Sequence, residues 1–248
     1  KDRRAYEYWS DGNIHAANQF MGSSFFDGTS ADHIGPISLG FVHDPRYLQP
    51  MPGGDNSSKR DRLQIVDIES IIKTEARTGV YPMSWQSKLI WEFIRNNYTT
   101  NPNKVPTIYR DALKQNMANF MFILLTILET CPKNGEDFLV SAFLETNYDY
   151  FKYSYSFNDK GEIVGKTDRH YTDRNQYETD RYRRIAIEAV YDYSEKDNRH
   201  NRHDLTSTEI ATLKSICTQI ESSTSVTKCK SLIINLVETV EKRIIRSL

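Results

Sequence analysis

Cysteine, glycine, proline and long apolar runs are all scarce in this chain of 248 residues. Cys131, Cys217 and Cys229 form no C-x-x-C pair, which gives no zinc-finger spacing and indicates a reducing compartment. With 11 Gly and 8 Pro, the chain is neither collagen-like nor broadly disordered. The longest apolar stretch, residues 117–128, is shorter than the roughly 20 residues of a membrane span. We therefore expect a buried helix there and no membrane as a partner.

An excess of one charge is also missing, because 32 Lys and Arg face 33 Asp and Glu, for a formal net charge of −1. This balance argues against binding nucleic acid through bulk charge. It leaves room for a local basic patch, because phosphate affinity depends on where the cations lie. The chain starts at Lys1 rather than Met, which favours a fragment of a longer protein. Its length suits one large domain or two small ones.

The turn and periodicity signals predict two extended segments followed by helices. Residues 32–37 and 47–51 are the extended candidates, and a helix capped by Asp55 or Asn56 is expected to run to Gly79. The same signals predict later helices over 85–94, 106–131, 137–150, 177–193, from 206 onward and over 225–245, with a hairpin at 151–166. We predict a mainly helical α+β fold. Residues 1–80 form its core, and residues 81–248 form a helical extension packing on that core as one continuous domain.

The first third of the chain carries the residues suited to chemistry. Neighbouring residues on a strand point to opposite faces, so Asp32 and His33 share a site only if the strand bends, which Gly35-Pro36 permits. An imidazole accepts protons near neutral pH. A carboxylate and an amide oxygen, such as those of Asp32 and Asn56, are hard ligands of the kind that Mg²⁺ prefers. Such a metal ion would lie where the second extended segment ends and the helix begins.

These residues resemble the HNH, or ββα-metal, nuclease superfamily. The matching pattern is D-H-I-x-P-x-S from Asp32 to Ser38 and N-x-x-K-x-D at Asn56, Lys59 and Asp61. The resemblance covers about residues 25–75. It implies a strand–strand–helix metal motif near the N-terminus, embedded in a larger helical domain with a small hairpin.

The resemblance also implies roles for individual residues. His33 would be the general base that activates water, and Asp32 and Asn56 would hold one divalent cation, Mg²⁺ with Mn²⁺ as a substitute. The substrate would be double-stranded DNA, cut by phosphodiester hydrolysis. The phosphate contacts would come from three cations: Lys59, Arg60 and Arg62. A solvated helix face is the simpler interpretation of these cations when the motif is left aside.

Two departures from the superfamily pattern are visible. Tyr47 stands where many members have an asparagine that supports the hairpin, so we expect Tyr47 to give a different support. No cysteine pairs are present that could bind a structural zinc ion, so no zinc is expected. The arrangement is most similar to the cleavage domain of a type IIS restriction endonuclease in the bacterial cytoplasm. A recognition region would then lie in a missing N-terminal part of the same chain.

Other interpretations remain open. The chain could be a catalytically idle HNH-like module that binds DNA or a partner, or a homing, phage or toxin nuclease. Asn56 could simply cap its helix. The apolar residues that recur along the helix expected over residues 225–245 could form the contact of a transient homodimer on DNA. Packing of this helix inside the chain is the favoured interpretation.

Several further polar residues have plain structural interpretations. His43 lies in the loop between the two extended segments and could approach the metal ion, but a surface loop is favoured. His200 and His203 have a spacing that zinc can use but no further ligand, so a solvated loop is favoured. Residues 148–193 combine tyrosines with arginines such as Arg181 and Arg183, a pattern that can bind DNA. Interleaved acidic residues favour a salt-bridged helix there instead.

Overall fold

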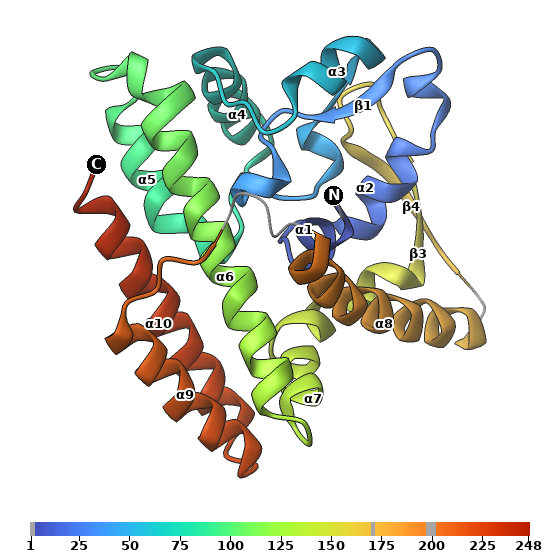
Figure 1. Cartoon of the computed structure of the whole chain (residues 1–248). Coiled ribbons are helices and arrows are strands. Elements are labelled where there is room, and N and C mark those ends of the chain that lie inside the picture. Colours follow the sequence, from blue (N-terminus) through green and yellow to red (C-terminus); the bar gives the residue numbers. More distant parts are fainter. Residues whose placement is uncertain (1–2, 170–171, 197–201) are drawn as a thin grey trace.

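The computed structural model describes residues 3–169, 172–196 and 202–248 (Figure 1). The first third contains α1 (Arg3–Tyr8), α2 (Ile14–Met21), β1 (Ser30–His33), β2 (Leu48–Met51), α3 (Gly53–Lys59) and α4 (Ile65–Thr78). The later elements are α5 (Lys88–Asn97), α6 (Arg110–Thr130), α7 (Gly135–Leu139), β3 (Tyr153–Phe157), β4 (Ile163–Asp168), α8 (Thr172–Lys196), α9 (Ser207–Glu221) and α10 (Val226–Ile245). The described residues are mainly helical with two-stranded hairpins, which confirms the expected α+β class.

The first hairpin is antiparallel, and its register pairs Asp32 with Gln49 and His33 with Leu48. β1 lies two residues earlier than the extended segment expected over residues 32–37, and β2 agrees with the expectation to within one residue. In chain order, β1, β2 and α3 therefore follow one another as strand, strand and helix. Figure 1 shows them together in the upper right of the molecule.

A bend directly after His33 explains why the first strand ends early. Pro36 lacks an N–H group, and a 3-10 turn over Ile37–Leu39 follows it. Gly35 packs against the ring of Phe41, where an added Cβ would lie 2.4 Å from Cγ. Only glycine fits at this position, so the sequence pair Gly35-Pro36 fixes the bend.

The long helix expected to reach Gly79 is divided into α3 and α4. α3 begins directly after Pro52, so neither Asp55 nor Asn56 is its N-cap, contrary to the prediction. It ends at Arg60, whose φ of 49° lies in the left-handed region and cannot continue a helix. The prediction failed because the apolar period belongs to α4 alone, whereas α3 buries none of its residues.

α4 has clear signals at both ends. Gln64 and Asp67 form a capping box at its start, and Gly79 with φ 69° ends it, as predicted. The capping box expected at Thr206 is likewise present at the start of α9. Hairpin β3–β4 and helices α8 and α10 also confirm their predictions. The helix expected over 137–150 differs, because α7 passes into a π-helical turn (Val140–Leu144) and then a 3-10 segment (Glu145–Lys152).

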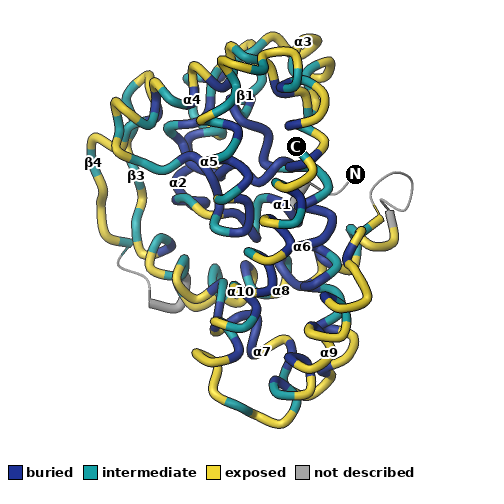
Figure 2. The backbone as a smooth tube through the Cα atoms, turned by 90° about the vertical axis from the view of Figure 1, so that its left-hand side faces the viewer, coloured by how far each residue is buried: buried dark blue, intermediate teal, exposed yellow. Residues whose placement is uncertain are grey.

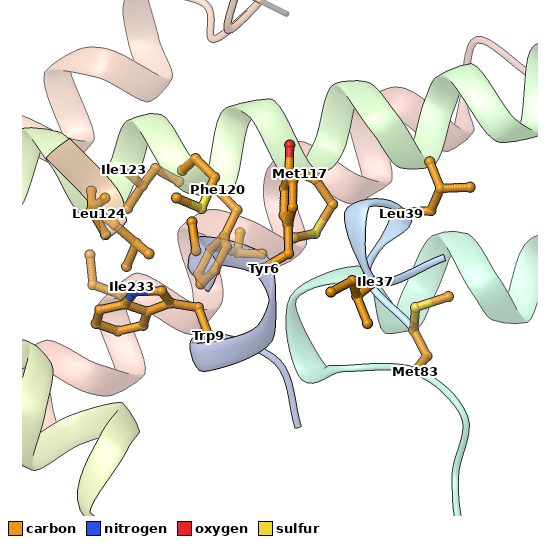
Figure 3. Packing of buried hydrophobic residues seen from close by; sticks show 14 of the residues in the cluster. Tyr6, Trp9, Ile37, Leu39, Met83, Met117, Phe120, Ile123, Leu124 and Ile233 are labelled. Carbon is orange, nitrogen blue, oxygen red and sulfur yellow. The ribbon is translucent and has the colours of Figure 1, made fainter. Parts of the chain in front are cut away.

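Helix α6 runs through the centre of the molecule, and the other elements pack around it (Figure 1). In Figure 3, Tyr6 and Trp9 from the N-terminal segment lie beside Phe120 and Leu124 of α6. One cluster of buried residues runs from Ala5 to Ile244 and includes residues of the first hairpin as well as of the later helices. Figure 2 shows the buried backbone of α6 inside a more exposed outer layer.

The apolar side chains along α10 pack against the rest of the molecule. Val237, Val240 and Ile244 are buried, and α10 packs on α5, α6 and α9. This confirms the favoured interpretation and leaves these side chains unavailable for a dimer contact. No helix among the described residues is both long and apolar enough to cross a membrane.

Candidate active site

The carboxylate of Asp32 lies on β1 and is largely buried, with the residue 6% exposed. Gln49 on β2 donates a hydrogen bond from Nε2 to Asp32 Oδ2 over 2.9 Å, and Lys59 donates from Nζ to the same oxygen over 2.7 Å. No hydrogen bond between described residues ends at Asp32 Oδ1. Gln49 was not among the site residues predicted from the sequence. Its signal is the strand register, which places it opposite Asp32.

The ammonium of Lys59 is surrounded by oxygen atoms inside the protein. Besides Asp32, it donates to the carbonyls of His33 and Ile34 over 2.9 Å and 3.0 Å. Asp67 of α4 lies 3.4 Å away. Lys59 therefore joins α3 to β1 and α4. A phosphate contact by Lys59 would have to replace these bonds.

His33 contacts a second histidine. His33 Nε2 lies 2.8 Å from Nδ1 of His43, and Nε2 of His43 lies 3.2 Å from Oδ1 of Asn18 on α2. The prediction that His43 lies in a surface loop is wrong, because its exposure is 0%. The backbone N–H of His43 donates to Asp11 across the interior, so this loop is held inside the fold. The alternative that His43 approaches the site left its contact with His33 unspecified.

Burial decides the charge of His43. Its pKa lies well below the ordinary imidazole value because burial and the neighbouring His33 disfavour the charged form, which outweighs the attraction of Asp44. His43 is therefore neutral near pH 7. It can accept a hydrogen bond at one ring nitrogen while donating one from the other.

Asp32 and His33 line the same cavity, together with Asn56 and Arg60. Its volume is about 420 Å³. Asn56 donates from Nδ2 to the carbonyl of Ala31, at 3.4 Å, and no hydrogen bond between described residues ends at its Oδ1. The imidazole of His33, the carboxylate of Asp32 and the amide of Asn56, which the sequence predicts to lie together, thus line one cavity.

The predicted phosphate contacts lie in different surroundings. Arg60 is exposed, lines the cavity and donates from Nε to the carbonyl of Ser57 over 3.3 Å. Arg62 is also exposed, but neither Arg62 nor Lys59 lines the cavity. Arg60 is consequently the predicted cation that faces the same space as His33.

Tyr47 supports the hairpin from inside. It is 2% exposed, its carbonyl accepts the N–H of Ile34 over 2.9 Å, and its hydroxyl donates to the carbonyl of Val80. Burial raises the pKa of Tyr47, so the hydroxyl stays protonated and able to donate. Tyr47 therefore connects the base of the hairpin to the segment that follows α4.

No group of three or more His, Cys, Asp or Glu residues is placed to hold a metal ion within residues 3–169, 172–196 and 202–248. Asp32 and Asn56 do not form such a group, because they supply one carboxylate and one amide. Of the two histidines with zinc-like spacing, His200 lies outside the described residues. His203 stacks on Phe122, with ring centroids 3.6 Å apart.

Two arginines of α8, Arg181 and Arg183, are paired with acidic residues. Arg183 lies 2.9 Å from Glu136 and 2.6 Å from Asp137, and Arg181 lies 3.5 Å from Glu178. These ion pairs agree with the salt-bridged helix favoured by the sequence. Arg181 and Arg183 thus have a structural explanation.

The cavity is thus lined by an imidazole and a carboxylate, which can transfer protons or bind cations, and by a guanidinium, which can bind an anion. Residues 1–245 match the family described as type II restriction endonuclease (RE_Alw26IDE). The chain belongs to this family of enzymes, which cleave DNA at specific sites. Comparisons with curated proteins and with solved structures give no match.

Proposed function

We propose that this chain cleaves DNA through an HNH-type site centred on His33. The observation that carries the proposal is that Asp32, His33, Asn56 and Arg60 line one cavity, at the point where hairpin β1–β2 meets α3. The order of strand, strand and helix is the one that the superfamily resemblance implies. The restriction endonuclease family supplies the substrate, DNA.

The donor set fits a divalent cation. Asp32 receives both hydrogen bonds at Oδ2, and Asn56 uses its amide nitrogen, so the Oδ1 atoms of the two residues remain for a metal ion. Mg²⁺ keeps several waters and needs only one or two protein ligands. A bound Mg²⁺ would supply Lewis-acid stabilisation of negative charge on the phosphate. Mn²⁺ would be accepted by the same oxygens.

The chain's own groups perform the proton transfer and the positioning. His33 accepts a proton from water, the water oxygen forms a bond to phosphorus, and the bond from phosphorus to the leaving ester oxygen breaks. Arg60 contacts a phosphate oxygen and orients the backbone of the DNA. Lys59 and Tyr47 hold the hairpin, so that the imidazole and the ligand pair keep their relative positions.

We further infer that this site belongs to a type IIS enzyme, which cuts at a fixed distance from the sequence that it recognises. Two features support the type IIS inference: the motif has no cysteine pairs that could bind a structural zinc ion, and a large helical extension surrounds it. Sequencing the ends made by the full-length enzyme on plasmid DNA tests this inference. Ends at a constant offset from one sequence support it, and ends inside a recognised palindrome contradict it.

Plasmid cleavage with Mg²⁺ tests the proposed base. We expect His33→Ala to lower the cleavage rate by about 10²–10⁴-fold, the usual contribution of a general base, while DNA binding persists. His203→Ala is the matched control, because His203 stacks on Phe122 and does not line the cavity. Normal cleavage by His33→Ala would remove His33 from this role, and normal cleavage with a chelator present would remove the metal ion.

A further inference from the structure

We propose that Arg169 binds a second phosphate of the DNA substrate, in a separate cavity that lies between α2 and α8. This second cavity has a volume of about 380 Å³, and its lining includes residues of α1, α2 and α8 together with Phe151 and Arg169. The inference rests on the proposed function, because it takes the first cavity as the place of the cleaved phosphate. Arg169 itself lies far outside the segment that resembles the HNH superfamily.

Arg169 differs from the other arginines that the structure describes as half-buried, because it has no acidic partner. Its guanidinium donates from Nε to the hydroxyl of Ser154 over 3.0 Å, and no other hydrogen bond or ion pair between described residues involves this side chain. The other half-buried arginines each form an ion pair with a carboxylate: Arg46, Arg95, Arg110, Arg183 and Arg243. A half-buried cation without an acidic partner favours binding of an anion from outside the chain.

Contacts with the second hairpin hold the guanidinium of Arg169 in place. Its backbone N–H donates to the carbonyl of Lys152 over 2.7 Å, and Ser154 on β3 accepts the hydrogen bond from Nε. The two terminal nitrogens remain for a ligand, and a guanidinium can donate from two nitrogens to two oxygens of one phosphate. Gln19 connects α2 to the same strand, because its Oε1 accepts the N–H of Tyr155 over 2.9 Å. The walls of the second cavity are therefore fixed by contacts within the chain.

The surroundings of Arg169 suit a phosphate group. Phe151 and Tyr182 in the lining are only 6% and 3% exposed, and an apolar surrounding strengthens the attraction between opposite charges. Two acidic residues also line the second cavity. Glu178 lies 3.5 Å from Arg181, so these two charges offset each other, and Glu7 lies at the border with the first cavity, which it also lines. Among the described residues, Arg169 is consequently the arginine of this lining that no carboxylate contacts.

The two cavities adjoin each other. Glu7 of α1 lines both, and α2 contributes Asn18 to the second cavity and Met21 to the first. In Figure 1, α1 and α2 lie between the hairpin β1–β2 and α8. DNA carries evenly spaced phosphates, so a duplex with one phosphate beside Arg60 has others within reach of Arg169. This continuity favours DNA over a free phosphate ion as the ligand of the second cavity.

Salt-dependent DNA binding tests this contact without any cleavage. The whole chain is titrated into a fluorescent DNA duplex with a chelator present, over a series of salt concentrations. We expect Arg169→Gln to lower the slope of log affinity against log salt by about 1 and to weaken binding roughly fivefold to tenfold at about 0.1 M salt, the effect of one phosphate contact. Arg184→Gln is the matched control, because Arg184 is exposed on α8 and does not line the second cavity. An unchanged slope in Arg169→Gln overturns the proposal.

Two further variants separate the charge of Arg169 from its contacts within the protein. Arg169→Lys keeps the positive charge, so its slope should equal that of the unaltered protein. A slope lowered equally in Arg169→Lys and Arg169→Gln contradicts an electrostatic contact. The double variant Arg60→Gln/Arg169→Gln should lower the slope by about 2, because the two cations line different cavities and contact different phosphates. A double variant whose slope equals that of Arg60→Gln alone contradicts a separate phosphate site.

Inorganic phosphate is the probe for a small-anion site in the second cavity. A rise in melting temperature with phosphate that Arg169→Gln abolishes, beside an unchanged DNA slope, assigns the cavity to free phosphate and overturns the DNA contact. Normal cleavage by His33→Ala contradicts the proposed function alone, because the slope is measured without a divalent cation. An inactive His33→Ala beside an unchanged slope in Arg169→Gln contradicts only the second phosphate site.

Discussion

The ammonium of Lys59 lies 2.7 Å from Oδ2 of Asp32, and both side chains are nearly buried, at 11% and 7% exposed. The same ammonium donates to the carbonyls of His33 and Ile34. Lys59 thus holds the oxygen-rich end of β1 against α3. The contact gives the spacing of Asp32 and Lys59 a structural role beside any chemical one.

We predict that Lys59→Met destabilises the protein by roughly 3 kcal/mol, because it leaves the nearly buried Asp32 carboxylate without its cation. Urea unfolding measures the change. Arg62→Met is the control, since Arg62 is exposed and should change stability by less than about 0.5 kcal/mol. Equal stability of the two variants would show that the Lys59 contacts contribute little.

The ligand pair can be tested by metal binding alone. We expect Mn²⁺ titrated into the protein to release heat of binding, and we expect Asp32→Ala and Asn56→Ala to abolish or strongly weaken it, because each removes one oxygen ligand. Ser58→Ala is the matched control on α3, since Ser58 is exposed and bonds only to the carbonyl of Gly54. Unchanged Mn²⁺ binding by Asn56→Ala would remove Asn56 from the site.

Arg60 should contact DNA phosphate because it is exposed and lines the cavity. We predict that Arg60→Gln weakens DNA binding about equally for all sequences and lowers the slope of log affinity against log salt by about 1. Binding is measured by fluorescence anisotropy over a salt series. Lys133→Gln, just beyond the C-terminal end of α6 and outside the lining of the cavity, is the control and should leave the slope unchanged. A slope identical to that of the unaltered protein would contradict the contact by Arg60.

Glu241 makes stability depend on pH. It is 0% exposed, its carboxylate accepts the N–H groups of Leu89 and Ile90, and burial raises its pKa to about 8 from 4.5. Between these values the unfolded state ionises first, so stability falls as pH rises, by at most about 1.4 kcal/mol per unit. Below 4.5 and above 8 this contribution is constant.

The variant Glu241→Gln isolates this effect. It cannot ionise, so urea unfolding between pH 5 and pH 8, inside the window of about 4.5 to 8, should lose the decline due to this group. Glu238→Gln on the same helix is the control, because Glu238 is partly exposed and paired with Lys242. A pH dependence that is the same in both variants would exclude Glu241 as its source.

Much of the candidate site could be predicted because it depends on neighbours in sequence. The pair Gly35-Pro36 predicts a bend. The hairpin and helix signals on either side of it predict that Asp32, His33 and Asn56 lie near one another. Gln49 could be found only after the register was known. The break at Arg60 was missed because a left-handed residue leaves no periodic signal when the surrounding helix buries nothing.

Local chemistry in the sequence determined the strand, turn and helix order, the capping box at Thr206, the end of α4 at Gly79 and the residues suited to hydrolysis. The tertiary structure alone decided that His43 is buried beside His33 and that Lys59 points inward. It also decided that Glu241 of α10 packs against the first turn of α5. These facts depend on contacts between residues far apart in the chain. Burial in such contacts sets hydrogen bonding and charge, and neither can be inferred from the identity of a residue and its neighbours.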